Sequence, residues 1–370
     1  MNPITATLFD YFQNTFPSIR KVISDMESAP QTSLFSRDKK SYQNELDDYL
    51  DEAVSLLLPE TPIKIRRELR RMDSELESLR EEKSNREAER ILGRESQEEM
   101  SEIKAVVVSV IGDSASTLIF GKDINAKIDE FEKQRNILIY EFQDNMENEF
   151  GINLTTKQCE SLLYQVNGED LIGAISAAMV LTEIEAHIRK IMLSADEDFS
   201  KKVRMKYYGL ALIVRLTIER LTEKHLVNYD EKYLPALSDL EDDNTRLQSD
   251  STRLLDELKD RSQDKLKIEQ NIRSLNSARR AIDYYRDMLM AKRNRVEQML
   301  REASKDAKVA RSTLQTLEHV MSVGGVASRA LEEFNSLSRL RPPDLLPLDD
   351  EKLYNDFLDI SRELAVKVAS

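Results

Sequence analysis

The side chains that most often carry out chemistry in enzymes are few and scattered in this sequence. Its three histidines, His187, His225 and His319, lie far apart, and none has a second histidine or a cysteine at the spacing of a metal site. Paired carboxylates are abundant, but charges three and four residues apart on a helix form ordinary solvated faces. We therefore expect no metal, no cofactor and no catalytic residues, and the protein is predicted not to be an enzyme.

The single cysteine, Cys159, stands near the predicted start of a helix. A helix N-terminus lowers the pKa of a thiol and can make it reactive, but cysteine is among the residue types most often buried, and burial is the role we expect. One cysteine cannot form an internal disulfide. The sequence shows no leader pattern and no run of about 20 apolar residues, so we expect a cytoplasmic protein without a transmembrane span.

The composition favours long helices over a thick globular core. Of the 370 residues, 33% are charged, 40% hydrophobic and 6% aromatic, and there are 9 glycines and 9 prolines. Few glycines and prolines mean few tight turns, and a thin helical bundle needs only a small core. The net charge of −14 disfavours nucleic acid and anionic lipid as partners. We predict an all-α fold, namely an elongated helical bundle with a long antiparallel or self-associating coiled coil.

An apolar stripe with a period of seven residues runs through the C-terminal half. From Leu240 to Leu317, eleven of the twelve positions reached in steps of seven are apolar, and the exception is Arg261. Such a stripe stays on one side of a helix only if the helix supercoils against a companion. We predict one uninterrupted helix over 236–323, paired with the same chain, a second copy or another protein. Its interaction seam consists of Leu240, Leu247, Leu254, Ile268, Leu275, Ile282, Leu289, Val296 and Leu317.

The charge of this predicted helix changes sign along its length. Residues 230–260 carry ten acidic and four basic side chains, whereas residues 261–311 carry fourteen basic and seven acidic ones. We expect the basic half to face an acidic helix, from a partner or from the same chain. The less favoured alternative is a patch for an anionic partner such as nucleic acid or lipid. That patch would consist of Arg279, Arg280, Arg286, Lys292, Arg293 and Arg295.

Helical periodicity and helix breakers divide the rest of the chain. Residues 1–62 are predicted to be an N-terminal helical segment, and 151–235 a compact helical core. Residues 63–150 combine a charged coiled-coil helix, an apolar stretch and a returning helix. The apolar stretch, 103–124, is the only β-branched run in the chain, and we expect a small β-hairpin or a buried helical turn there. Residues 324–370 are predicted to be amphipathic helices behind Gly- and Pro-containing linkers, the last helix docking on the same chain.

The function that these features favour is helix pairing. We predict an acidic, non-enzymatic coiled-coil interaction or scaffold protein that forms oligomers or binds a protein partner. One alternative is a membrane-acting helical protein, pore-forming or remodelling, that uses the apolar 103–124 segment. It is less favoured because Lys104 and Asp113 would enter the lipid. A second alternative is an accessory subunit of a nucleic-acid machine, which rests on the basic patch alone.

Overall fold

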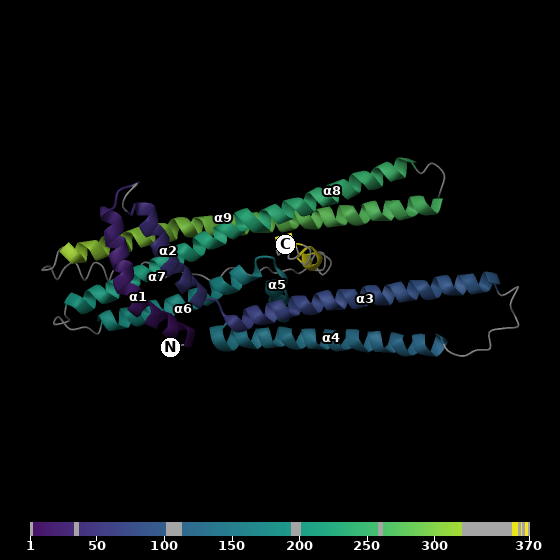
Figure 1. Cartoon of the computed structure of the whole chain (residues 1–370), viewed down its shortest axis with the longest axis horizontal. Coiled ribbons are helices and arrows are strands. Elements are labelled where there is room, and N and C mark those ends of the chain that lie inside the picture. The colour runs from purple at the N-terminus through teal and green to yellow at the C-terminus, as the bar shows by residue number, and fades with distance from the viewer. Residues whose placement is uncertain are drawn as a thin grey trace. The chain divides into compact units, whose positions relative to one another are not determined.

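A computed structural model describes residues 3–32, 37–100, 113–193, 201–257, 262–319 and 357–361, together with 364, 367 and 368. All regular secondary structure in these ranges is helical (Figure 1), so the predicted all-α class is confirmed. A hairpin over 103–124 is wrong for the described part of that stretch, because a helix begins at Asp113. An aspartate in the first turn favours a helix N-terminus. Residues 103–112 lie outside the described ranges.

The chain forms two compact units. One is continuous in sequence and spans Glu60–Leu163, whereas the other combines Met1–Pro59 with Tyr164–Ser370. We call them the 60–163 unit and the main unit.

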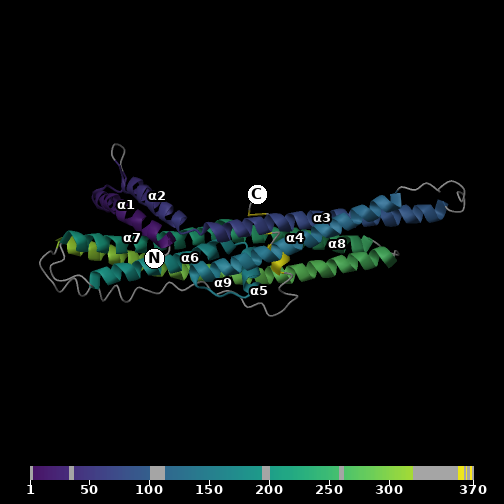
Figure 2. The same ribbon diagram turned by 90° about the horizontal axis from the view of Figure 1, so that it is seen from below.

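The 60–163 unit is built on two antiparallel helices, α3 (Glu60–Met100) and α4 (Asp113–Phe150), which lie side by side in Figures 1 and 2. Leu76 packs against Ile124 and Ile128 between them. Apolar residues at heptad spacing near the start of α3 are buried. They are Ile65, Leu69, Met72 and Leu76.

A short helix, α5 (Thr156–Tyr164), completes the 60–163 unit. The chain leaves α4 at Gly151, whose φ of 64° is a conformation that favours glycine. Helix α5 starts with a capping box, because the Thr155 N–H donates to Oε1 of Gln158 (2.9 Å) and the Gln158 N–H donates to Oγ1 of Thr155 (3.3 Å). Arg66 is fully buried, and its Nε–H donates to the carbonyl of Leu163 at the end of α5 (2.9 Å).

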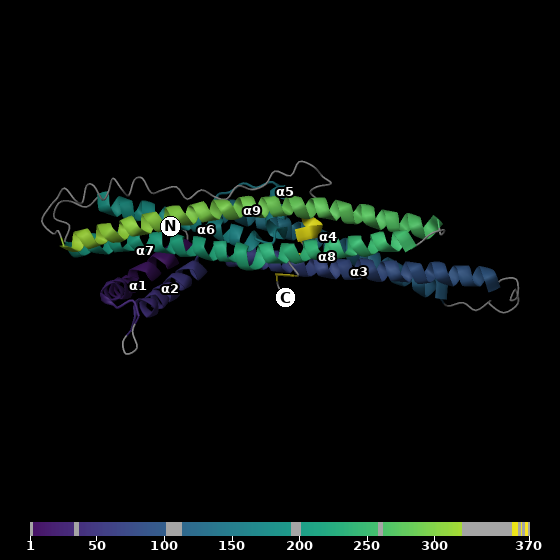
Figure 3. The same ribbon diagram turned by 90° about the horizontal axis from the view of Figure 1, so that it is seen from above.

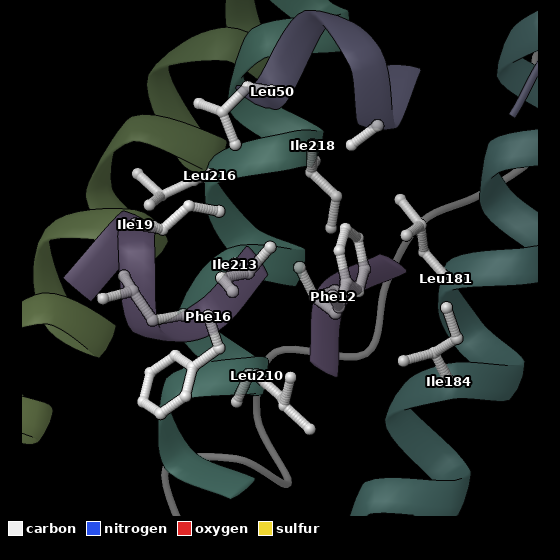
Figure 4. Packing of buried hydrophobic residues seen from close by; sticks show 14 of the residues in the cluster. Phe12, Phe16, Ile19, Leu50, Leu181, Ile184, Leu210, Ile213, Leu216 and Ile218 are labelled. Carbon is white, nitrogen blue, oxygen red and sulfur yellow. The ribbon is translucent and has the colours of Figure 1, made fainter. Parts of the chain in front are cut away.

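The main unit has its hydrophobic core between four helices and the end of a fifth. These are α1 (Pro3–Ser28), α2 (Lys39–Leu56), α6 (Gly168–Leu193), α7 (Lys201–Asn228) and α9 (Ser262–His319). Figure 4 shows Phe12, Phe16 and Ile19 of α1 pointing toward α7, with Leu181 and Ile184 of α6 on the other side. Every residue from Leu210 to Ile218 is buried, which confirms that α7 is covered on several sides.

Helix α7 continues through Pro235 rather than ending there. A π-helical turn, η1 (Tyr229–Tyr233), joins it without a break to α8 (Leu234–Glu257). Proline lacks a backbone N–H and clashes with the preceding helical turn. The turn just before Pro235 is widened, because the Leu234 N–H bonds to the carbonyl of Tyr229, five residues back. We expected a compact core to end at residue 235 and a separate helix to begin at residue 236. The helix instead continues across this boundary.

The prediction of one uninterrupted helix over 236–323 is wrong. Helix α8 ends at Glu257, and α9 begins at Ser262 and runs back beside α8 and then α7 (Figures 1 and 3). Asp230 pairs with Arg293, and the Asn244 side chain bonds to the carbonyl of Leu275, so the two helices are antiparallel. The companion of the apolar stripe on α9 is thus formed by α8 and α7 of the same chain. Arg261, the one polar position of the stripe, lies outside the described residues.

Candidate functional site

The predicted seam divides by burial into three groups. Leu240, Ile282 and Leu289 are buried, and Ile268, Leu275 and Val296 are half-buried. Leu247 and Leu254 are exposed instead, at 51% and 47% of their surface. The side chain of Leu317 lies outside the description. Most of the stripe on α9 therefore faces the protein, whereas the outer half of the stripe on α8 faces solvent.

The contact line on α8 follows steps of three and four residues rather than seven. It passes through Leu237, Leu240 and Asn244, which are all buried, and then through Gln248, whose Nε2 donates to Oδ1 of Asn276 (2.7 Å). A strict seven-residue step drifts by about 20° per repeat on an ideal helix. Leu247 and Leu254 therefore lie off this line, on a flank of α8 that is exposed to solvent.

The two halves of opposite charge meet in the hairpin, as expected for an acidic part of the same chain. Arg286 forms an ion pair with Glu241. Arg293 holds Asp230 through two hydrogen bonds, of 2.7 Å from Nε and 3.0 Å from Nη2. This contact lowers the pKa of the Asp230 carboxyl. Two of the six residues of the predicted anionic-partner patch are therefore engaged in ion pairs within the hairpin.

The other members of the predicted patch are spread over two environments. Lys292 is half-buried, and its Nζ donates to Oε1 of Gln165 (2.6 Å). Burial is the main cause that lowers the pKa of Lys292 to about 8. Arg279, Arg280 and Arg295 are exposed on α9. The six predicted cations therefore do not form one exposed surface.

The described C-terminal residues cover the inner half of the hairpin. Phe357, Ser361 and Leu364 are buried, and the ring of Phe357 stacks on that of Tyr285 at 4.9 Å between centroids. The Tyr285 hydroxyl receives hydrogen bonds from the Val166 N–H and the Ser361 hydroxyl, each of 3.1 Å. The described C-terminal residues therefore pack on the same chain, as expected of the last helix.

A salt link ties these C-terminal residues to α8 as well. The Lys367 ammonium donates to Oδ2 of Asp243 (2.8 Å), and this contact lowers the pKa of the Asp243 carboxyl. Asp243 lies one helical turn before Leu247. The covered part of the hairpin therefore ends where the exposed leucines begin.

Cys159, His187 and His225 lie in different local surroundings. Burial raises the pKa of the Cys159 thiol to about 12, which makes it a poor nucleophile at neutral pH. His187 contacts the ring of Phe9, and Nε2 of His225 lies 4.0 Å from Asp170. Burial lowers the pKa of His225. Within the described ranges, no three of the His, Cys, Asp and Glu residues are grouped as metal ligands.

One described helix has the length and composition of a membrane-spanning segment. It is the stretch Gly168–Met192 of α6, with a mean hydropathy of 1.5. Some 67% of its most apolar window is buried inside the fold, and the core helix of a water-soluble protein has the same properties. Hydropathy therefore does not distinguish the two roles for α6.

Sequence reasoning missed the polar side chains that fix the hairpin. Asn244 and Gln248 stand on the contact line of α8, and Tyr285 joins α9 to the C-terminal residues. A signal for the first two was present, because Leu237, Leu240, Asn244 and Gln248 follow each other at three- and four-residue spacing. Comparison of the chain with protein-family models, curated proteins and solved structures found no match.

Proposed function

We propose that this protein is a non-enzymatic interaction protein that acts through helix–helix pairing on the outer half of the α8–α9 hairpin. The observation that carries the proposal is the exposure of Leu247 and Leu254, which lie seven residues apart on one side of α8. Single exposed leucines are common on protein surfaces, but aligned ones on a helix form the kind of strip that a second helix covers.

The rest of the hairpin explains why this strip is available. The inner half is covered by the C-terminal residues, through Phe357, Ser361 and Lys367. The α8–α9 contact itself is completed by Leu237, Leu240 and Asn244, so Leu247 and Leu254 are not needed to hold the hairpin together. Side chains that are costly to expose and are not used by the fold are available for a partner.

Site-specific photo-crosslinking tests this proposal without knowledge of the partner. A benzophenone amino acid is placed at residue 254, or at residue 245 as the control, and the protein is irradiated in the cells that produce it. Thr245 is exposed and lies about 180° away from Leu254 around an ideal helix. We expect a discrete adduct, with a second copy or with another protein, from position 254 only. Equal adducts from both positions, or none from either, would refute the proposed surface.

A second candidate function is action on membranes through residues 103–124. The observation that favours it is the antiparallel packing of α3 and α4, since this apolar, β-branched stretch follows α3 in the sequence and includes the first turns of α4. Leakage of dye from anionic and neutral liposomes, measured for the natural chain and for Val107→Asp, tests it. Leakage that Val107→Asp abolishes would support the candidate, and intact liposomes with the natural chain would remove it.

A further inference from the structure

A short sequence repeat accompanies the exposed leucines. The pattern Asp-x-Thr-Arg-Leu occurs at Asp243–Leu247 and again at Asp250–Leu254. Each arginine pairs with the aspartate of its own repeat, Arg246 with Asp243 (3.0 Å) and Arg253 with Asp250 (3.1 Å), and both pairs are exposed to solvent. Exposed ion pairs of this kind contribute little to the stability of a chain by itself. The repeat is therefore not explained by the folding of the hairpin.

The repeat forms a surface on one side of α8. Asn244 faces α9 and serves as the reference position on α8. At 3.6 residues per turn, Leu247 and Leu254 lie about 60–80° around the helix from Asn244. Asp243 and Asp250 lie about 100–120° from Asn244 in the same direction. Lys367 lies on this side of α8 because it bonds to Asp243. The surface thus begins at the end of the C-terminal cover and continues along the outer half of α8.

We propose that this surface binds the same surface of a second copy of the chain, with the two α8 helices antiparallel about a two-fold axis beside residues 250 and 251. This inference rests on the proposed function and names its partner. In that arrangement Leu247 of each copy packs on Leu254 of the other, so all four exposed leucines are covered at once. A two-fold contact requires such a self-complementary patch.

The charges of the repeat favour the antiparallel direction. Antiparallel pairing brings Asp250 of one copy within about two residues, or 3 Å along the axis, of Arg253 of the other. It places Arg246 equally close to Glu257 of the second copy. Parallel pairing in register would instead set aspartate beside aspartate and arginine beside arginine, which is repulsive. In this contact the leucines supply most of the affinity, and the charges select the orientation.

The size of the contact sets the expected strength. One face of a single helix per copy is smaller than a standard stable interface, which buries about 1,600 Å² in total. The association is therefore reversible and depends on concentration, in the micromolar range or weaker. The C-terminal residues that cover the inner half of the hairpin do not obstruct this association. The two α8 helices, centred on residues 250 and 251, contact each other only through the part of α8 beyond Asp243.

Cysteine pairs test both the contact and its direction. In a chain with Cys159→Ser, Leu247→Cys and Leu254→Cys are made separately. In the antiparallel arrangement, like positions lie about 10 Å apart along the axis, too far for a disulfide. We therefore expect mild oxidation to join the two variants when they are mixed, at least about tenfold faster than either alone. Thr245→Cys, mixed with either variant, is the control and is expected to remain unjoined.

Sedimentation velocity over a range of concentrations gives an independent measurement. We expect the natural chain to self-associate and the double variant Leu247→Ser/Leu254→Ser to do so at least about tenfold more weakly, with an unchanged circular dichroism spectrum. Faster joining of like positions than of the mixture would overturn the antiparallel contact. A natural chain that stays monomeric would overturn the inference as a whole. An adduct between residue 254 and a different protein would then still support the proposed function.

Discussion

Lys292 is a cation that the fold keeps partly out of water. Its Nζ has Gln165 as a hydrogen-bond acceptor, and burial lowers its pKa to about 8, from an ordinary value near 10.4. The sign of the effect follows from proton binding. Between about pH 8 and pH 10.4 the unfolded chain holds a proton that folded Lys292 has lost, so this residue makes stability rise with pH in that window. Below pH 8 the folded protein bears the full free-energy cost of burying the protonated Lys292 side chain.

Replacing Lys292 by methionine should therefore stabilise the protein at pH 7. We expect a gain of about 1–2 kcal/mol in the free energy of unfolding, after loss of the bond to Gln165. Urea unfolding at pH 7 and pH 10 measures it, and the gain should shrink at the higher pH. Lys305→Met, at an exposed position of the same helix, is the control. A loss of stability at pH 7, or a gain that is independent of pH, would contradict the cost assigned to Lys292.

Gly209 of α7 lies directly under the ring of Phe16. A Cβ atom at residue 209 would stand 1.8 Å from Cε2 of Phe16, whereas one at Gly173 of α6 would stand 2.9 Å from the flexible end of Leu58. Phe16 is seen beside α7 in Figure 4. Both glycines are helical, and alanine has the better helix propensity by about 1 kcal/mol. The two positions therefore differ in packing and not in backbone preference.

We expect Gly209→Ala to destabilise the protein by about 2 kcal/mol, because the Phe16 ring must move out of a packed core. Gly173→Ala should leave stability unchanged or raise it slightly. Adding Phe16→Leu to Gly209→Ala should recover part of the loss. Urea unfolding curves of the four proteins test this. Equal effects at the two glycines would show that the ring does not set the cost.

At the scale of helices, the sequence predicts where helices form better than where they reverse or continue. The all-α class, the capping box at Thr155 and the buried α7 follow from local patterns. The reversal of the chain after Glu257 was not predicted. Leu254 and Ile268 are separated by fourteen residues, which is two steps of seven, so the seven-residue pattern continues unchanged from α8 into α9. The passage through Pro235 was missed because a π-turn depends on packing around η1, which no local pattern encodes.

The candidate surface was only partly predictable, for a related reason. The seven-residue stripe identified Leu247 and Leu254 as partner-facing residues, but assigned the same role to Leu240, which the hairpin buries. Burial in an antiparallel pair depends on which residues of the opposite helix stand level with each position. That register is fixed by contacts such as Asn244 with Leu275, which are distant in sequence. Periodicity alone cannot distinguish a seam within the chain from one between chains.

Asn244 is a polar residue inside the α8–α9 contact. It is 7% exposed, its Nδ2 donates to the carbonyl of Leu275 (3.3 Å), and its Oδ1 has no hydrogen-bond partner in the described part of the chain. A buried amide with one unsatisfied oxygen costs stability, but its directional bond restricts the register of the two helices.

Asn244→Leu should raise the free energy of unfolding by about 1 kcal/mol and loosen the register. Urea unfolding gives the first quantity. The rate of disulfide formation between cysteines placed at residues 248 and 276, which are hydrogen-bonded neighbours, gives the second and should fall. Asn271→Leu, at an exposed position of α9, should change neither. A destabilised Asn244→Leu variant would mean that the single amide bond outweighs the unsatisfied oxygen.

For the whole molecule, the division into two units has an energetic consequence. In the 60–163 unit Leu76 packs against Ile124 and Ile128, and Leu69 on the same helix is fully buried, whereas the main unit buries Leu181 in the cluster that contains Phe12. Units with separate cores unfold as separate cooperative transitions unless the contact between them is strong. The chain is therefore expected to unfold in two steps.

Leu69→Ala and Leu181→Ala assign these steps. Both leucines are fully buried, and each truncation should cost about 2–5 kcal/mol in its own unit. Differential scanning calorimetry should show two endotherms, with Leu69→Ala lowering the midpoint of one and Leu181→Ala that of the other. Hydrogen exchange of α3 and of α7 then identifies which endotherm belongs to which unit. A single endotherm that both substitutions shift together would mean that the two cores unfold as one cooperative body. Substitutions in either unit would then also lower the stability of α8.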